Sequence, residues 1–224
     1  MAYRRTEKVE HRLAARHDAI LSAARAAAAE GGMAAVHIAP VAERAGIAAG
    51  TVYRYFPAKT DLVAELVARI SGQELSAMRA ASDAAPGPLS ALAAAIVTFA
   101  ARALRSRRLM WAVLAEPVEA EIDAARLAYR RSLAAELETR IRAAAGGKHL
   151  PEQDAALAAS ALVGALTEAL IGPLARVGGE DDPAKTRAAV QAVTLLALRA
   201  LGVVDARARG VVVQTALPVS ETSA

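Results

Sequence analysis

The sequence of 224 residues contains no cysteine, which excludes disulfide bonds, thiolate metal sites and cysteine nucleophiles. Aromatic residues are also scarce, since the chain has only two Phe, four Tyr and one Trp. Hydrophobic residues nevertheless make up 55% of the chain, and most of them are Ala and Leu. Because these two residues favour helices over strands, we predict an all-α protein with a sizeable core.

Signatures of enzymes and of membrane proteins are absent as well. The four histidines show no metal-ligand spacing, no serine lies in a Gly-x-Ser-x-Gly motif, and no glycine-rich phosphate loop is present. We therefore expect no catalytic residue, no metal and no cofactor. The first 17 residues are charged, and no apolar run reaches the roughly 20 residues of a membrane span. A cytoplasmic protein that does not enter the membrane is expected.

The organisation of the chain follows from its apolar periodicity and its breaks. Spacings of three and four predict helices at about 10–30, 38–45, 49–56, from 59 onward, 89–104, 107–115, 118–145, 151–176 and 183–202. The stretch ASDAAPGP at 81–88 interrupts this pattern. We therefore predict a first domain at 1–80, a larger helical domain at 81–204, and a loosely ordered tail at 205–224.

Three of the seven aromatics lie within four positions, in the stretch GIAAGTVYRYFPAKTDL that begins at Gly46. Two short helices around Gly46 have the proportions of a helix-turn-helix. Val52 and Phe56 are four residues apart and should face the core. Tyr53 and Tyr55 should point elsewhere and offer hydroxyls to phosphate. The net charge is +4, and no acid lies between Arg44 and Lys59, which favours an anionic partner such as DNA.

The run AERAGIAAGTVYRYFPAKTDL, preceded by a helix that ends in EGG, resembles the DNA-binding domain of TetR-family transcriptional regulators. The resemblance implies that the second short helix enters the major groove and that Lys59 contacts a phosphate. The candidate DNA-binding residues are His37, Ala49, Gly50, Thr51, Tyr53, Arg54, Tyr55 and Lys59.

Three helix starts depart from the family pattern. His37, Ala48 and Ala58 stand where family members often carry Ser or Thr, and loss of such a cap costs roughly 0.5–2 kcal/mol. Asp61 is expected to compensate in part at the third start.

The second domain is expected to bind an apolar or amphipathic small-molecule effector of unknown identity. Large side chains at Phe99, Met110, Trp111 and Tyr129 suit a mostly apolar pocket, and Glu116 or Glu168 could supply its polar group. Plain core packing is the alternative for each of these residues.

A homodimer is expected because the segments 157–174 and 190–201 are apolar nearly all round. An ordinary internal helix pair is the alternative. The residues expected at a dimer interface through the last two long helices are Leu162, Leu166, Leu170, Val193 and Leu196.

These features together predict a ligand-responsive repressor that binds a palindromic double-stranded DNA operator as a dimer. Two alternatives stay open. The chain could be an activator or a nucleoid-type DNA binder that has no effector. It could also be a helical interaction protein that has lost operator recognition, since three caps are missing.

Overall fold

The structure is a computed structural model and describes residues 2–117, 120–175 and 182–217. Regular structure within these ranges is entirely helical, as predicted. The elements are α1 (Ala2–Gly31), the short 3-10 helix η1 (Met33–Ala35), α2 (Ile38–Arg44), α3 (Ala49–Tyr55), α4 (Lys59–Asp83), α5 (Pro88–Arg105), α6 (Arg107–Leu114), α7 (Ala120–Gly146), α8 (Ala155–Leu170), α9 (Pro183–Ala200) and α10 (Asp205–Gln214).

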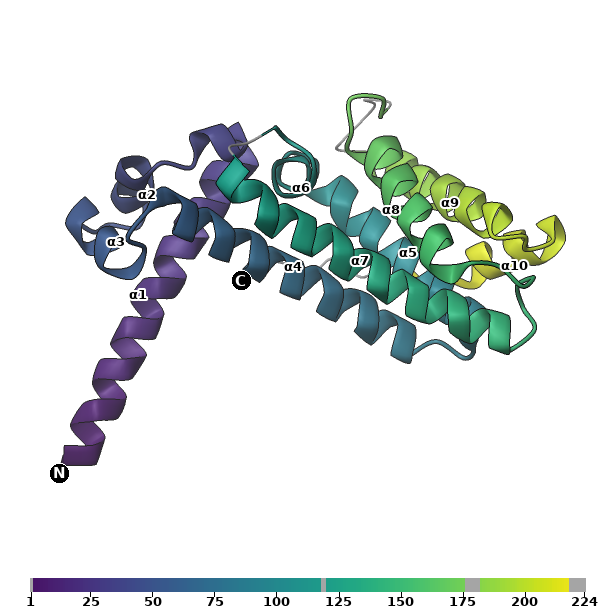
Figure 1. The fold of residues 1–224 in the computed structure, drawn as a ribbon, viewed down its shortest axis with the longest axis horizontal. Helices are drawn as coiled ribbons and strands as arrows, with labels where there is room; N and C mark the ends of the chain where they lie inside the picture. Colours follow the sequence, from purple (N-terminus) through teal and green to yellow (C-terminus); the bar gives the residue numbers. More distant parts are fainter. Residues whose placement is uncertain (1, 118–119, 176–181, 218–224) are drawn as a thin grey trace.

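The helices form an elongated molecule with short helices gathered at one end (Figure 1). The short helices α2 and α3 lie at one end, α8, α9 and α10 lie at the other, and α4, α5 and α7 run between them (Figure 1). The N-terminal half of α1 projects away from the other helices (Figure 1). This arrangement places α4 in contact with α1 near its start and with α5 and α7 further along.

The central helix is α5, which begins with Pro88 in its first turn, where proline is tolerated. Its 18 residues are long and apolar enough to cross a membrane, but 72% of this window is buried inside the fold. It contacts α4, α7, α8, α9 and α10. Burial on nearly every side explains its composition, because a helix covered all round by other helices is apolar all round.

The predicted domain boundary at 80–81 falls inside α4, which continues to Asp83. Just beyond it, the Ser82 hydroxyl donates a 2.9 Å hydrogen bond to the carbonyl of Ala91 in α5. An ion-pair network also joins this end of α4 to α7, since Glu136 accepts from Arg79 at 2.7 Å and from Arg140 at 2.9 Å. One continuous helix therefore links the two parts of the molecule, and the division at this point stays a prediction.

The tail differs from the expectation of loose order over 205–214, where the chain forms α10. Ala208 and Val212 lie one turn apart and are buried in contact with the rest of the core. Asp205 pairs with both Arg199 and Arg209. Asp205 and Arg209 have the i, i+4 spacing that brings two side chains together on a helix. Residues 218–224 lie outside the described residues.

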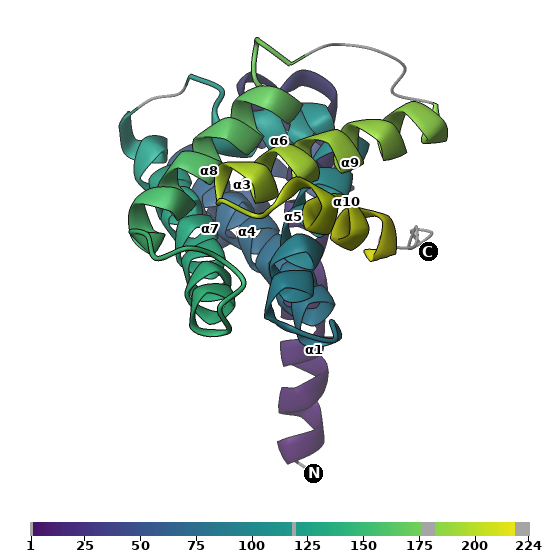
Figure 2. The same cartoon turned by 90° about the vertical axis from the view of Figure 1, so that its right-hand side faces the viewer.

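Four of the five residues expected at the dimer interface are buried within their own chain. Leu162, Leu166, Leu170 and Val193 are 3–8% exposed and pack into the core of their own chain. Only Leu196, at 57%, points to solvent. The helices α8 and α9 each have one side buried and one side exposed. Because both sides are apolar, the sequence does not distinguish them. Figure 2 shows α8 and α9 at the surface on the end of the molecule that faces the viewer.

Candidate nucleic-acid interface and the helices that hold it

The turn of the helix-turn-helix depends on Gly46. Its φ of 67° lies in the left-handed region that favours glycine. In this conformation the Gly46 N–H donates to Glu43 O and the Ile47 N–H donates to Ala42 O, both at 3.0 Å. These bonds satisfy carbonyls at the end of α2 and let the chain reverse direction into α3.

The helix α3 is held by one face and exposes the other. Val52 and Phe56 are 0% and 2% exposed, which confirms that they anchor the helix to the core. Tyr53 is 52% exposed, and Arg54 is also exposed. Gly50 is exposed and a Cβ there would meet nothing within 4 Å, so another backbone or a base can approach closely. Ala49 and Thr51, in the first turn, are half-buried.

Tyr55 differs from the prediction that its hydroxyl faces outward. Its hydroxyl oxygen is buried and has no hydrogen-bond partner. The ring lies 6.2 Å from the imidazole of His17, which itself stacks on Phe56 at 5.3 Å. The Nε2 atom of His17 lies 2.8 Å from a carboxylate oxygen of Glu65. Tyr55 therefore packs the C-terminal end of α3 against α1, and α1 covers its ring.

The helix starts near the candidate interface lack side-chain caps, as their residue types predict. His37, Ala48 and Ala58 precede α2, α3 and α4 in extended conformations without a side-chain cap bond from their own side chains. The Asp61 carboxylate accepts the Ala58 N–H at 3.0 Å, which is the compensation expected from that acid. Lys59 is the first residue of α4 and is half-buried, so its cation lies at the positive end of the helix dipole.

Two ion pairs set α2 and α4 against α1. Arg44 donates to both carboxylate oxygens of Glu30 at 2.6 Å, which lowers the pKa of that carboxyl. Arg69 of α4 donates to Asp18 at 2.5 Å. These contacts, together with the buried face of α3, hold α2, α3 and α4 against α1 and leave the exposed side chains of α3 facing solvent.

A family model for the bacterial regulatory proteins of the tetR family matches residues 20–66, which include the helix-turn-helix. These residues are similar to the tetR family, and they make up less than half of the chain. Two relatives are HTH-type transcriptional repressors KstR. The protein from Rhodococcus jostii is 50% identical over 54 residues, and the one from Mycobacterium tuberculosis is 43% identical over 68 residues. The matches cover 24% and 30% of this chain, and the chain spans only about a quarter of the length of these curated relatives (26% and 29%).

Solved structures extend the similarity of fold over nearly the whole chain. RolR in complex with resorcinol superposes with a TM-score of 0.67 and 21% identity, covering 94% of this chain and 98% of that one. FadR from Bacillus subtilis, in complex with stearoyl-CoA, superposes with a TM-score of 0.68 and 21% identity, covering 80% of this chain and 96% of that one. These likenesses show the fold, an N-terminal helix-turn-helix followed by a larger helical part.

A contact between α1 and α6 corrects the role predicted for Glu116. Its carboxylate accepts the backbone N–H of Met33 at 2.8 Å, and Arg108 donates to the carbonyl of Gly31 at 3.0 Å. Arg108 and Glu116 lie 3.7 Å apart. We call this group the α1–α6 clasp. Because Glu116 is committed to the backbone just before α2, it is not a free polar group for an effector in this structure.

Gly32 lies at the centre of the clasp, with φ 75° and ψ −169°. A Cβ at this position would lie 2.5 and 2.6 Å from the two carboxylate oxygens of Glu116. This backbone region is essentially restricted to glycine. The clasp therefore requires glycine both for its conformation and for its space.

The predicted pocket residues are only partly brought together. Phe99, Met110 and Tyr129 are 1–3% exposed and belong to one core between α5, α6 and α7. Trp111 is half-buried at its edge, and Glu168 is exposed on α8. Glu168 lies outside this core, because α8 turns its leucines inward.

Two polar side chains of α7 are buried in this core without full satisfaction. The Tyr129 hydroxyl and the Nε of Arg126 have no hydrogen-bond partner among the described residues. Burial raises the pKa of the Tyr129 phenol well above its usual value, and burial lowers the pKa of the Arg126 guanidinium. Arg126 is only 4% exposed and donates to the carbonyl of Ala112 at 2.8 Å.

Proposed function

We propose that this chain is a DNA-binding transcriptional repressor that responds to a small-molecule effector and acts in the cytoplasm. The observation that carries the proposal is α3. It is anchored by Val52 and Phe56 and presents Gly50, Tyr53 and Arg54 to solvent from a TetR-family helix-turn-helix. A rigid helix with a glycine, a phenol and a guanidinium on its open side can lie in a major groove and contact bases and phosphates.

The contacts are assigned by side-chain chemistry. Thr51 and Arg54 are placed at base edges or phosphates, and Ala49 at a thymine methyl. Tyr53 and Lys59 are placed at phosphates, where a bound anion would also relieve the unfavourable position of Lys59 at a helix start. His37, exposed before α2, is placed near the DNA backbone. Tyr55 supports α3 from behind, since its hydroxyl is buried.

The repressor is proposed to be a homodimer through the exposed faces of α8 and α9. Leu157 and Leu196 are 68% and 57% exposed there. Between them the exposed positions are mainly small, among them Ala161, Ala165 and Ala192. Small side chains let helices from two copies approach closely, and burial of the two leucines would stabilise the pair. A two-fold dimer suits a palindromic operator.

The effector is proposed to bind in the core of the larger helical part. The support is the pair of unsatisfied atoms on α7, the Tyr129 hydroxyl and the Arg126 Nε, because buried polar atoms without partners are rare in proteins. A ligand oxygen could accept from either of them. Phe99 and Met110 would contact its apolar part. Resorcinol in RolR and stearoyl-CoA in FadR are the ligands of those proteins.

The test of DNA recognition is a fluorescence-anisotropy titration with labelled DNA from upstream of the protein's own gene. A scrambled duplex runs beside it, both at two salt concentrations. A preference of about a thousandfold or more for the upstream DNA is expected, as for other specific readers. Equal and steeply salt-dependent binding to both duplexes would contradict specific readout and favour a nucleoid-type binder.

Lys59→Ala and Thr51→Ala are expected to weaken DNA binding in different ways. Lys59→Ala should weaken binding to every duplex and reduce the slope of log affinity against log salt by about one. Thr51→Ala should weaken operator binding more than random binding and leave the slope nearly unchanged. Arg131→Ala, an exposed arginine on α7, is the matched control and should bind both duplexes as the wild type does. Equal losses for Thr51→Ala on both duplexes would argue against base readout by α3.

Tyr129→Phe is expected to stabilise the protein without ligand by about 1 kcal/mol. The change removes a buried hydroxyl that has no partner and keeps the ring. Thermal unfolding measures this effect. If the hydroxyl binds an effector, the same variant should respond to that effector less than the wild type does. A loss of stability of more than about 1 kcal/mol would show that the hydroxyl is already satisfied, for example by water, and would argue against an empty ligand subsite.

A further inference from the structure

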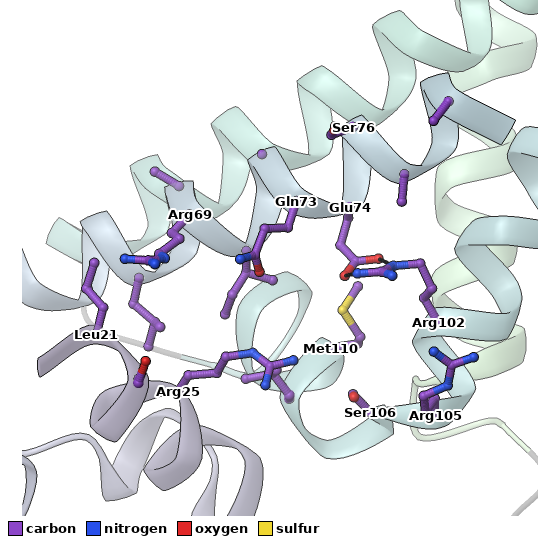
Figure 3. A pocket seen from close by; sticks show the side chains of 18 residues that line it. Leu21, Arg25, Arg69, Gln73, Glu74, Ser76, Arg102, Arg105, Ser106 and Met110 are labelled. Carbon is purple, nitrogen blue, oxygen red and sulfur yellow. Dashed lines mark hydrogen bonds and ion pairs between the residues drawn. The ribbon is translucent and has the colours of Figure 1, made fainter. Parts of the chain in front are cut away.

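A long groove runs along the outside of α4, on the side where α1, α5 and α6 meet it (Figure 3). Its volume is about 1140 Å³. Along α4 it extends from Leu66 to Ala80, which corresponds to roughly 21 Å at 1.5 Å per residue. Tyr129 is not among its lining residues, but Met110, which belongs to the same core as Tyr129, is.

The walls of the groove carry an excess of positive charge. Four arginines and one carboxylate, Glu74, line it. Arg102 already engages that carboxylate through two hydrogen bonds of 2.6 and 2.9 Å. Arg69 is paired with Asp18, which lies outside the groove. The walls therefore favour an anion, since clefts lined by one sign of charge concentrate the opposite charge.

After Arg102 and Arg69 are paired with carboxylates, the remaining positive charge in the groove comes from Arg25 of α1 and Arg105 at the end of α5. Among the described residues neither forms an ion pair or a side-chain hydrogen bond. In Figure 3 the side chains of Arg25 and Gln73 extend into the groove from its two walls, and Arg105 lies beside Ser106 near the far end. Planar guanidinium groups in such positions bind phosphate or carboxylate through paired hydrogen bonds.

The bottom of the groove is apolar. Leu66 and Ile70 of α4 are 1% and 3% exposed, and Leu109 and Met110 of α6 are 2% and 1% exposed, yet all four line it. The groove thus combines a buried hydrocarbon surface with cationic walls. This combination suits a ligand that has an apolar chain and an anionic group.

We propose that this groove binds an elongated amphipathic anion, with its phosphate or carboxylate held by Arg25 and Arg105 and its apolar part over Leu109 and Met110. Its anion-binding arginines differ from the polar groups proposed for the effector, Tyr129 and Arg126, and of the residues named for the two sites only Met110 is common to both. The proposed binding of the anion does not depend on the proposed function. Only its effect on DNA binding rests on the proposed function. Because Arg25 comes from α1 and Arg105 from α5, the anion connects the helix-turn-helix side of the molecule to the larger helical part. If DNA also binds one arrangement of these helices better, the anion and DNA change each other's affinity by the same factor.

The test is isothermal titration calorimetry of the full-length chain at constant ionic strength with three probes. Octyl phosphate and octanoate carry the two candidate anions on similar chains, and octanol is their neutral counterpart. At least one anion is expected to bind about tenfold or more tightly than octanol. Arg25→Gln and Arg105→Gln should each weaken that anion about tenfold, which is the size expected for loss of a charged hydrogen bond.

Two control variants separate the groove from other cationic surfaces. Arg131→Gln on α7 and Lys59→Ala at the candidate DNA interface should bind the anion as the wild type does. The proposal is overturned if octanol binds as well as the anions, if both arginine variants keep wild-type affinity, or if Lys59→Ala alone abolishes binding. Circular dichroism checks that each variant is folded.

Operator binding is measured on the same preparations without probe. If the wild type does not bind the operator specifically, the proposed repressor function is contradicted. A measured affinity for the anion would still support the groove proposal. Normal operator binding without any anion binding would overturn the groove proposal alone.

Discussion

Replacing Gly32 with alanine is expected to lower the free energy of unfolding by about 3 kcal/mol, and the melting temperature by roughly 6–12 °C for a chain of this size. The backbone at φ 75° and ψ −169° is unfavourable for any residue with a Cβ. The new Cβ would also displace the Glu116 carboxylate, which breaks its 2.8 Å bond to the Met33 N–H. Thermal unfolding followed by circular dichroism measures the change.

Gly72→Ala is the matched control for this experiment. Gly72 lies exposed inside α4, and a Cβ there would meet nothing within 4 Å. Alanine should therefore stabilise the helix by about 0.5–1 kcal/mol. A Gly32→Ala protein that melts within 2 °C of the wild type would mean that the α1–α6 clasp is not formed in solution.

Aspartate at Leu166 and at Leu196 is expected to have opposite consequences. Leu166 is 3% exposed in the core of its own chain, so Leu166→Asp should cost more than about 4 kcal/mol and leave little folded protein. Leu196 is 57% exposed, so Leu196→Asp should melt at nearly the wild-type temperature. In a two-fold dimer through α8 and α9 it would, however, place two carboxylates in one apolar interface, and monomers should result.

Thermal unfolding measures the loss of stability in Leu166→Asp. Analytical ultracentrifugation measures the change from dimer to monomer in Leu196→Asp. Leu127→Asp, a partly exposed leucine on α7, is the control outside α8 and α9 and should stay dimeric. A folded Leu196→Asp protein with an unchanged dimer would contradict the proposed interface. A well-folded Leu166→Asp protein would contradict the packing of α8 on its own chain.

The contrast between Tyr53 and Tyr55 shows how far helical spacing predicts α3. The inward positions of Val52 and Phe56 and the exposure of Tyr53 follow from a spacing of 3.6 residues per turn and are confirmed. Tyr55 was assigned to the same open side as Tyr53, and its hydroxyl is buried. Spacing could not show this, because the position is covered by His17 from a helix about 40 residues earlier in the chain.

The sequence by itself determined the helical class, the positions of nearly all helices and the helix-turn-helix, because these depend on local periodicity, on caps and on glycine at a left-handed position. Only the tertiary structure decided which sides of α8 and α9 face inward, because helices apolar all round carry no periodic signal for orientation. It also decided the partner of Glu116, since its hydrogen bond to Met33 spans 83 residues. The burial of Arg126 was decided in the same way, by helices that meet only when the chain is folded.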